Sequence, residues 1–183
     1  MRALIFTLLL AAIPSIAHAQ KPLVPPFIYS PPSCNFEIKF PEKFFTNKKC
    51  IGNECSEVVS FAKTIKDSTV DFRLTCDAKS AADITKIKAT DLKASAKELA
   101  DNAGLRSYGE DTATLPDGTV SAVTIALGKR GDKETIYTGQ YWIGTNSLLT
   151  LEAEMRGPAN KEIEKIYTGI LESVKVRPTN KVY

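Results

Sequence analysis

Histidine is almost absent from this sequence. The only one among the 183 residues is His18, and it lies in an N-terminal segment that we expect to be removed from the mature chain. Histidine is the usual general base of serine and cysteine hydrolases, and it is the commonest neutral metal ligand. A mature chain without histidine therefore argues against both of these kinds of site.

Other motifs and an excess of one charge are also missing. No two cysteines are spaced as C-x-x-C, which argues against thiol–disulfide exchange, and no D-x-D-x-D-G segment is present to bind calcium. The 24 Lys and Arg residues are nearly balanced by 21 Asp and Glu residues, and the isoelectric point is about 8.6. A dedicated nucleic-acid binder would be more basic than this. The sequence thus predicts no catalytic residue, no cofactor, no metal site and no nucleic-acid partner.

The N-terminus has the pattern of a signal peptide. Arg2 supplies one positive charge, residues 3–13 form an apolar run, and residues 17–19 read Ala-His-Ala, which signal peptidase cleaves. A membrane anchor is the alternative, but the run is shorter than the roughly 18 residues that span a bilayer, and Pro14 ends it. We therefore predict a signal peptide over residues 1–19 and an exported protein, either periplasmic or secreted.

The four cysteines are Cys34, Cys50, Cys55 and Cys76. In an oxidising compartment they are expected to form two disulfides. The nested pattern pairs Cys34 with Cys76 and Cys50 with Cys55, and closing these two loops is worth up to about 4 and about 2 kcal/mol respectively. The pairing of Cys34 with Cys50 and of Cys55 with Cys76 is entropically as favourable and remains an alternative.

Residues 20–33 contain five of the ten prolines. Proline fixes φ and lacks the N–H that a sheet requires, so we predict an extended, polyproline-like arm. Phe27 and Tyr29 in this arm are candidates for docking to a partner. The alternative is a leader that lies on its own domain or stays mobile.

The first half of the domain contains strands followed by a helix. Alternation of apolar and polar residues predicts strands over 36–40, 58–65 and 69–77, the last two forming a hairpin around residues 66–68. A helical period follows over 80–103. Lys86, Lys93 and Lys97 lie opposite its apolar arc, where they would meet anionic lipid or an acidic partner, or simply face solvent.

The second half reads as four strands over 112–115, 119–127, 134–143 and 147–155, followed by a helix over 160–173. Short turns between the strands predict an antiparallel meander. The third strand is apolar on both faces, with Tyr137, Tyr141 and Ile143 on one and Ile136 and Trp142 on the other. Other elements are therefore expected to cover the sheet on both sides.

Two sets of side chains in this half are candidates for function. Glu152 and Glu154 lie two apart on one strand and point to the same side, where a carboxylate pair serves as acid and base or simply forms a wet face. Tyr137, Tyr141 and Trp142 are residue types that favour protein interfaces, although they also suit a core under a covering helix.

The order of elements resembles the PsbP/Mog-like superfamily, which includes bacterial envelope proteins related to DcrB. The resemblance rests on Phe-Glu-Ile-Lys-Phe-Pro at 36–41, Leu-Pro-Asp-Gly-Thr-Val at 115–120 and Ile-Leu-Glu-Ser-Val-Lys-Val at 170–176. It implies an α+β fold, with an antiparallel sheet of about six or seven strands between two helices in an α/β/α sandwich. We place this disulfide-stapled domain at residues 34–177, with a C-terminal tail over 178–183.

The resemblance also implies a role as a binding or assembly factor and transfers no site residue. Together with the export signal and the missing histidine, it leads to the hypothesis of an exported, soluble, non-enzymatic accessory protein that recognises another protein. One alternative is a secreted inhibitor or effector that binds an enzyme or an anionic membrane surface. The other is a hydrolase that uses only carboxylates.

Overall fold

The structure, a computed structural model, describes residues 26–51 and 54–177. The predicted signal peptide, the first part of the predicted arm and the predicted tail lie outside the described residues. The strands are β1 (Phe27–Tyr29), β2 (Phe36–Phe40), β3 (Phe45–Ile51), β4 (Glu54–Ile65), β5 (Ser68–Ala78), β6 (Arg106–Thr114), β7 (Val120–Arg130), β8 (Lys133–Ile143), β9 (Ser147–Arg156) and β10 (Lys175–Val176). The helices are α1 (Ala81–Ile84), α2 (Ala89–Asn102) and α3 (Lys161–Glu172).

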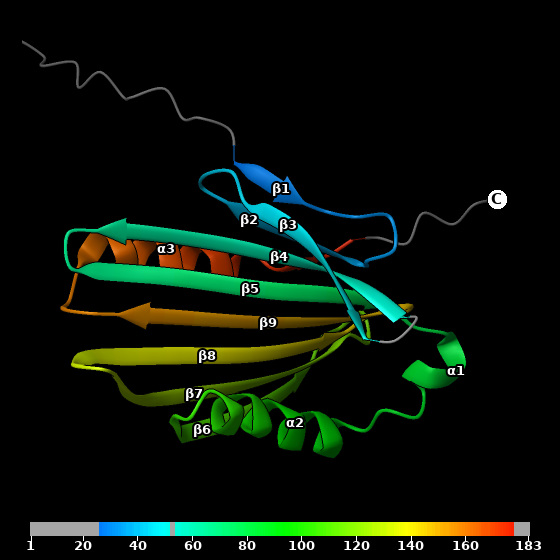
Figure 1. The fold of residues 1–183 in the computed structure, drawn as a ribbon. Coiled ribbons are helices and arrows are strands. Elements are labelled where there is room, and N and C mark those ends of the chain that lie inside the picture. Colours follow the sequence, from blue (N-terminus) through cyan, green and yellow to red (C-terminus); the bar gives the residue numbers. More distant parts are fainter. Residues whose placement is uncertain (1–25, 52–53, 178–183) are drawn as a thin grey trace, which may run out of the picture.

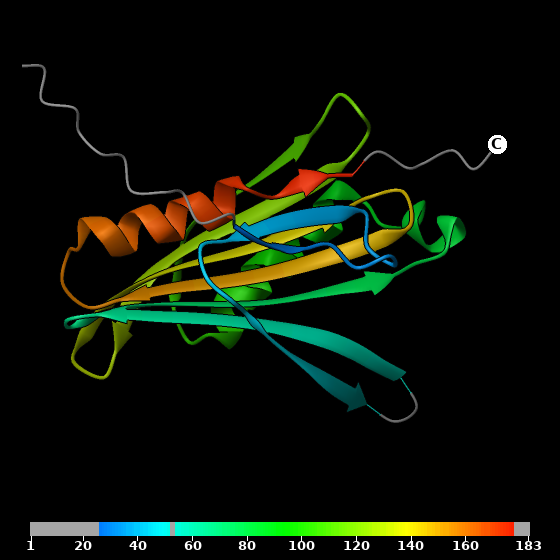
Figure 2. The same cartoon turned by 90° about the horizontal axis from the view of Figure 1, so that it is seen from above.

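Seven strands form one antiparallel sheet, the large sheet, in the order β3-β4-β5-β9-β8-β7-β6. After β5 the chain runs through α1 and α2 to the far edge, and β6 to β9 return one by one until β9 pairs with β5 (Figure 1). The predicted hairpin and the predicted meander are both confirmed. At the other edge, the β3–β4 hairpin extends away from the body of the molecule (Figure 2).

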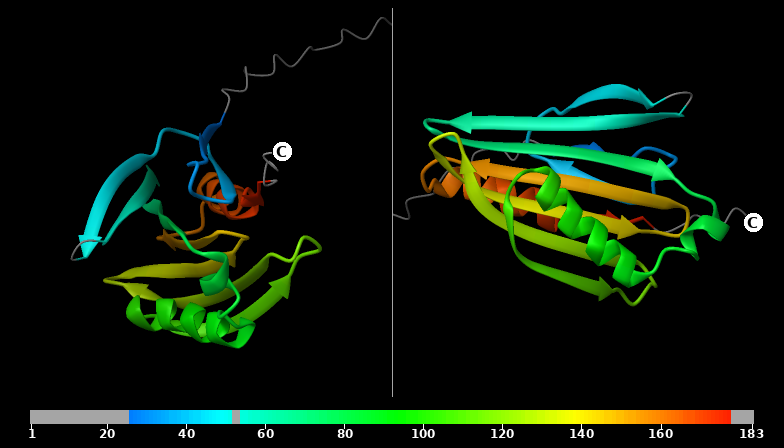
Figure 3. Two further views of the ribbon diagram at one scale, coloured as in Figure 1. Left: turned by 90° about the vertical axis from the view of Figure 1, so that its right-hand side faces the viewer. Right: turned by 60° about the horizontal axis from the view of Figure 1, so that its bottom comes forward.

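The two longer helices cover opposite faces of the large sheet, as Figure 3 shows. Helix α2 packs on β6, β7 and β8, where Leu92, Ala96 and Ala100 are buried. Helix α3 packs over β4, β5 and β9, where Ile163 and Ile170 are buried. The predicted α+β sandwich is therefore confirmed, but each helix lies over a different half of the sheet.

Strands β1, β2 and β10 form a separate antiparallel sheet, the small sheet, which was not predicted. Strand β2 lies in its middle, and Phe36, Ile38 and Phe40 project from it into the core beneath α3 with 0% exposure. The last described residue is fixed beside it, because the Arg177 N–H donates to the Asn35 carbonyl at 2.6 Å and the Arg177 guanidinium donates to the Cys34 carbonyl. The α3 side of the domain is thus a helix together with a small sheet.

Both disulfides follow the nested pattern, and the alternative pairing is wrong. Cys34 pairs with Cys76, with their Cα atoms 5.8 Å apart, and this bond joins the segment before β2 to strand β5 of the large sheet. Cys50 pairs with Cys55 directly across the β3–β4 hairpin, at a Cα separation of 4.0 Å. The first bond therefore joins two layers of the fold, whereas the second closes one hairpin.

The predicted single helix over residues 80–103 is wrong, because the chain breaks between α1 and α2. In an unbroken helix Ile87 would lie about 140° around the axis from Leu92 and could not share its apolar face. The break turns both Ile84 and Ile87 onto the cluster that contains Leu92 and Ala96. The apolar contacts of these two partly buried side chains therefore outweigh continuation of the helix.

Candidate functional site

The offset between the two helices leaves two parts of the large sheet open. On the α2 side, nothing among the described residues covers the polar face of β5 and β9 beyond the helix. On the α3 side, the face of β7 and β8 beyond that helix is open and carries exposed apolar side chains. These two surfaces are the polar groove and the apolar strip described below.

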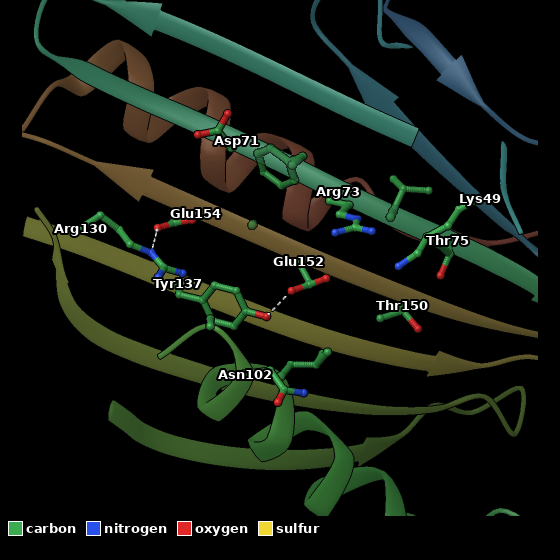
Figure 4. A pocket seen from close by; sticks show the side chains of 15 residues that line it. Lys49, Asp71, Arg73, Thr75, Asn102, Arg130, Tyr137, Thr150, Glu152 and Glu154 are labelled. Atoms are coloured by element: carbon green, nitrogen blue, oxygen red, sulfur yellow. Dashed lines mark hydrogen bonds and ion pairs between the residues drawn. The ribbon is translucent and has the colours of Figure 1, made fainter. Parts of the chain in front are cut away.

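The polar groove runs along the flank of α2 and has a volume of about 660 Å³. Its floor is formed by β5 and β9, one wall by the end of α2, and its ends by Arg130 and Lys49 (Figure 4). Side chains of alternate residues on β5 and β9 point to the same face of the sheet, and on this face they are polar. Its polar lining residues are Lys49, Asp71, Arg73, Thr75, Asn102, Arg130, Tyr137, Thr150, Glu152 and Glu154.

The three carboxylates of the groove all have protein partners. The Tyr137 Oη donates to Glu152 Oε2 at 2.9 Å, and Arg130 Nε donates to Glu154 Oε1 at 2.9 Å. Asp71 forms an ion pair with Arg156. The predicted pair of glutamates therefore lies on one face as expected, but each carboxylate is already engaged by a neighbouring side chain.

Tyr137 is held in its neutral form. Burial is the main cause that raises the pKa of its phenol above the usual value, and the neighbouring Glu152 carboxylate raises it further. A neutral phenol is a hydrogen-bond donor, so Tyr137 fixes the position of Glu152 without adding charge to the groove.

The apolar strip consists of Ile125, Leu127 and Ile136, which are 44%, 44% and 38% exposed. Ile125 and Leu127 lie two apart on β7, and Ile136 of β8 is directly opposite Leu127, so the three side chains adjoin on one face. The two residues opposite Ile125, Gly109 of edge strand β6 and Thr138 of β8, are small. The expectation that other elements cover both sides of this strand is thus wrong at Ile136.

The predicted aromatic cluster is divided between the two faces of the sheet. Tyr137 and Tyr141 pack on the α2 side, whereas Trp142 packs on the α3 side with its ring 6.3 Å from that of Phe36. Tyr137 is only 3% exposed, and Tyr141 and Trp142 are half-buried. The division between the faces follows the alternation expected along β8, and the burial of Tyr137 favours the core alternative for that ring.

The arm residues also differ in their placement. Phe27 is 42% exposed, but Tyr29 is 4% exposed and packs against Phe44, with the two ring centroids 6.0 Å apart. Both belong to β1, which pairs with β2. This part of the arm therefore belongs to the folded domain, and Tyr29 is corrected from a surface residue to a core residue.

The three lysines do not form a continuous basic face. Lys86 lies in the break between α1 and α2, whereas Lys93 and Lys97 lie on α2. Lys86 pairs with Asp83 at 3.0 Å and Lys97 pairs with Asp101 at 2.7 Å, so two of the three charges are compensated locally. The described part of the chain contains no helix able to span a membrane and no cluster of three or more His, Cys, Asp or Glu side chains suited to a metal ion.

The residues that complete both surfaces were not predicted from the sequence. The sequence pattern placed Arg73 in a predicted strand and Lys49 next to the cysteine loop, and it marked neither as a binding residue. Ile125 and Leu127 have the pattern of ordinary strand residues. The sequence did indicate that Ile136 belongs to a second apolar face of β8. Only the placement of α3 shows that this face is open.

No protein-family model matches this sequence, and no curated protein matches it. Among solved structures, the solution structure of cyanobacterial PsbP (CyanoP) from Synechocystis sp. PCC 6803 aligns with 91% of this chain and 98% of its own, at a TM-score of 0.51 and 13% identity. A protein of unknown function from Pseudomonas aeruginosa aligns with 85% of this chain and 100% of its own, at a TM-score of 0.47 and 13% identity. The likeness to CyanoP confirms the predicted PsbP-like fold.

Proposed function

We propose that this protein is an exported, non-enzymatic accessory protein that binds another protein through the apolar strip. The observation that carries this proposal is the adjoining exposure of Ile125, Leu127 and Ile136 on a sheet face that no described element covers. Contiguous apolar surface on a soluble domain marks an interaction site far more often than single exposed residues do.

The surroundings of the strip define the chemistry of its partner. Arg106 of β6 is exposed and lies directly opposite Leu127, and it forms no ion pair with any described residue. Lys129, at the end of the strip, is already paired with Glu134 at 3.1 Å. The partner is therefore a protein with a complementary apolar patch and a carboxylate at its edge that meets Arg106.

Two further observations support export and a role in binding. Disulfides persist in oxidising compartments, and this small domain contains two of them, one joining its layers. The glutamates proposed for carboxylate chemistry are engaged by Tyr137 and Arg130, which suits a fixed binding surface better than an acid and a base acting on a substrate. The lysines offer less support for a membrane-binding effector, because Lys86 and Lys97 are paired.

Photo-crosslinking from the strip tests this proposal. A photoreactive residue at position 127 of the mature chain should capture one defined partner, and the same residue at position 62, exposed on the opposite face, should not. With the purified partner, the double variant Ile125→Thr/Leu127→Thr should raise the Kd about tenfold or more, because it removes the apolar contacts and keeps strand-forming residues.

Ala62→Thr is the matched control and should leave the Kd unchanged. If the partner crosslinks equally at both positions, or if the double variant binds it as tightly as the native chain, the strip is not the binding surface.

A further inference from the structure

We propose that the polar groove is a binding site for the carboxylate of a small polar ligand, with Arg73 as the residue that contacts the carboxylate and Lys49 as a second cation. The groove lies on the face of the sheet opposite the apolar strip, so this site goes beyond the proposed function and does not depend on it.

The groove lining carries three cations, Lys49, Arg73 and Arg130, and three carboxylates, and Arg156 beside it adds a fourth cation. Asp71, Glu152 and Glu154 each have a partner, namely Arg156, Tyr137 and Arg130. Within the described residues, Arg73 and Lys49 form no ion pair, although both line the groove. Because the Tyr137 phenol is neutral, Glu152 keeps its charge, and the groove together with Arg156 has one net positive charge. Arg73 and Lys49 are its two cations without an ion-pair partner among the described residues.

Arg73 is the cation on the floor of the groove. It lies in the middle of β5, where the pairing places it directly opposite Glu152 on β9, and that carboxylate is held by the phenol of Tyr137. The guanidinium of Arg73 and the ammonium of Lys49 both project into the groove (Figure 4). A guanidinium offers two parallel N–H donors that match the two oxygens of a carboxylate.

Neutral donors lie beside the two cations. The hydroxyl-bearing residues Thr75 and Thr150 and the amide of Asn102 line the same groove. Their side chains hydrogen-bond to the polar atoms of a ligand without changing the charge of the site. The lining is thus suited to an anionic group attached to a polar body.

The acidic residues of the groove favour a carboxylate over a phosphate. Three carboxylates line the same groove, so a dianion would meet more repulsion than a monoanion. Glu152 and Glu154 also keep free acceptor capacity, which favours hydroxyl or ammonium groups next to the ligand's carboxylate. The volume of about 660 Å³ falls in the range of small-molecule sites. Such a ligand is either a sugar acid or the acidic end of a peptide.

Titrations of the mature chain, followed by two-dimensional NMR, test this site and distinguish the two sources. Galacturonate represents a sugar acid and the dipeptide Gly-Glu represents an acidic peptide, while galactose and inorganic phosphate serve as comparisons. We expect saturable shifts at Arg73, Thr75 and Thr150 with at least one of the two carboxylates. Binding should weaken as salt is added, because the groove is open to solvent.

Arg73→Gln should raise the Kd of the bound carboxylate about tenfold or more, and Lys49→Gln should raise it by a smaller factor. Lys86→Gln, outside the groove, is the control and should have no effect. Circular dichroism of each variant verifies that the fold is retained. The proposal is overturned if neither carboxylate gives saturable shifts, if phosphate or galactose binds as tightly, or if Arg73→Gln binds like the native chain.

Discussion

The phenolic Oη of Tyr137 donates a hydrogen bond of 2.9 Å to Oε2 of Glu152 across the neighbouring strands β8 and β9. Tyr137 is 3% exposed, and both its burial and the carboxylate raise the pKa of its phenol. The folded chain therefore keeps this proton at pH values where the unfolded chain begins to lose it.

This linkage predicts that the free energy of unfolding falls as the pH rises above about 10, the usual pKa of tyrosine. Above that pH the unfolded chain releases the proton and the folded chain retains it, so the folded state loses relative stability. Tyr167 acts in the same direction, because burial raises its pKa to about 12. Urea unfolding between pH 8.5 and 11 measures the slope. Tyr137→Phe should make the slope shallower, and an unchanged slope in this variant would contradict the assignment.

Removal of the disulfide that joins the two layers should cost more than removal of the one in the hairpin. The double variant Cys34→Ala/Cys76→Ala opens a loop with a sequence separation of 42, and it should lose about 4 kcal/mol of unfolding free energy. Cys50→Ala/Cys55→Ala opens a separation of 5 and should lose about 2 kcal/mol. Urea denaturation of both variants provides the comparison, and the reverse order would show that loop closure does not govern their stability.

Asn35 should be essential for the turn between β8 and β9. It is 7% exposed, and its Oδ1 accepts hydrogen bonds from the Asn146 N–H at 2.8 Å and from the Ser147 hydroxyl at 3.1 Å. Gly144 lies so close that an added Cβ would be 2.8 Å from Asn35 Oδ1. Asn35→Ala leaves the buried Ser147 hydroxyl and the part-buried Asn146 N–H without this acceptor, so thermal or urea unfolding should show a loss of about 1–3 kcal/mol.

Asn47→Ala on the exposed edge strand β3 is the matched control for Asn35→Ala. It removes the same side chain from a solvent-exposed position, so its effect should stay within about 0.5 kcal/mol. Equal losses in the two variants would mean that the network around Asn35 contributes nothing specific.

Two isoleucines distinguish the covered face from the open one. Ile163 of α3 is 0% exposed, and Ile163→Ala should cost about 2–5 kcal/mol because it leaves a cavity in the core. Ile136 of the apolar strip is 38% exposed, and Ile136→Ala should cost about 1 kcal/mol or less. Chemical denaturation of the isolated protein measures both. A large loss at Ile136 would indicate that something in the free protein covers the strip.

The elements with a clear period were predictable from the sequence. Alternation along residues 69–77 and the stripe of Ile163, Tyr167 and Ile170 depend on neighbours close in sequence, so the β4–β5 hairpin and α3 appear where expected. The break before Ala89 was not predictable in this way, because it depends on where Ile84 and Ile87 find apolar contacts. The small sheet was missed because β10 is a strand of only two residues that pairs with a segment far away in the sequence.

The candidate surfaces were predictable only in part. Glu152, Glu154 and Tyr137 were selected by residue type, and all three line the polar groove. Arg73 and Lys49 join them only because β5 pairs with β9 and because β3 folds back along β4. The apolar strip is exposed because α3 does not extend over β7. The position of α3 depends on tertiary packing and not on any local sequence pattern.

Strand β2 has one neighbour, β1, that is close in sequence and another, β10, that comes from the end of the domain. During translation β10 leaves the ribosome after every other described element. One edge of β2 therefore has no strand to pair with until β10 has been made. A premature stop before Lys175 would leave that edge bare and would remove Arg177 from the Asn35 and Cys34 carbonyls. Such a shortened product would still contain every residue of the groove and of the strip. It would lack the contacts that β10 and Arg177 make with β2 and with the segment before it.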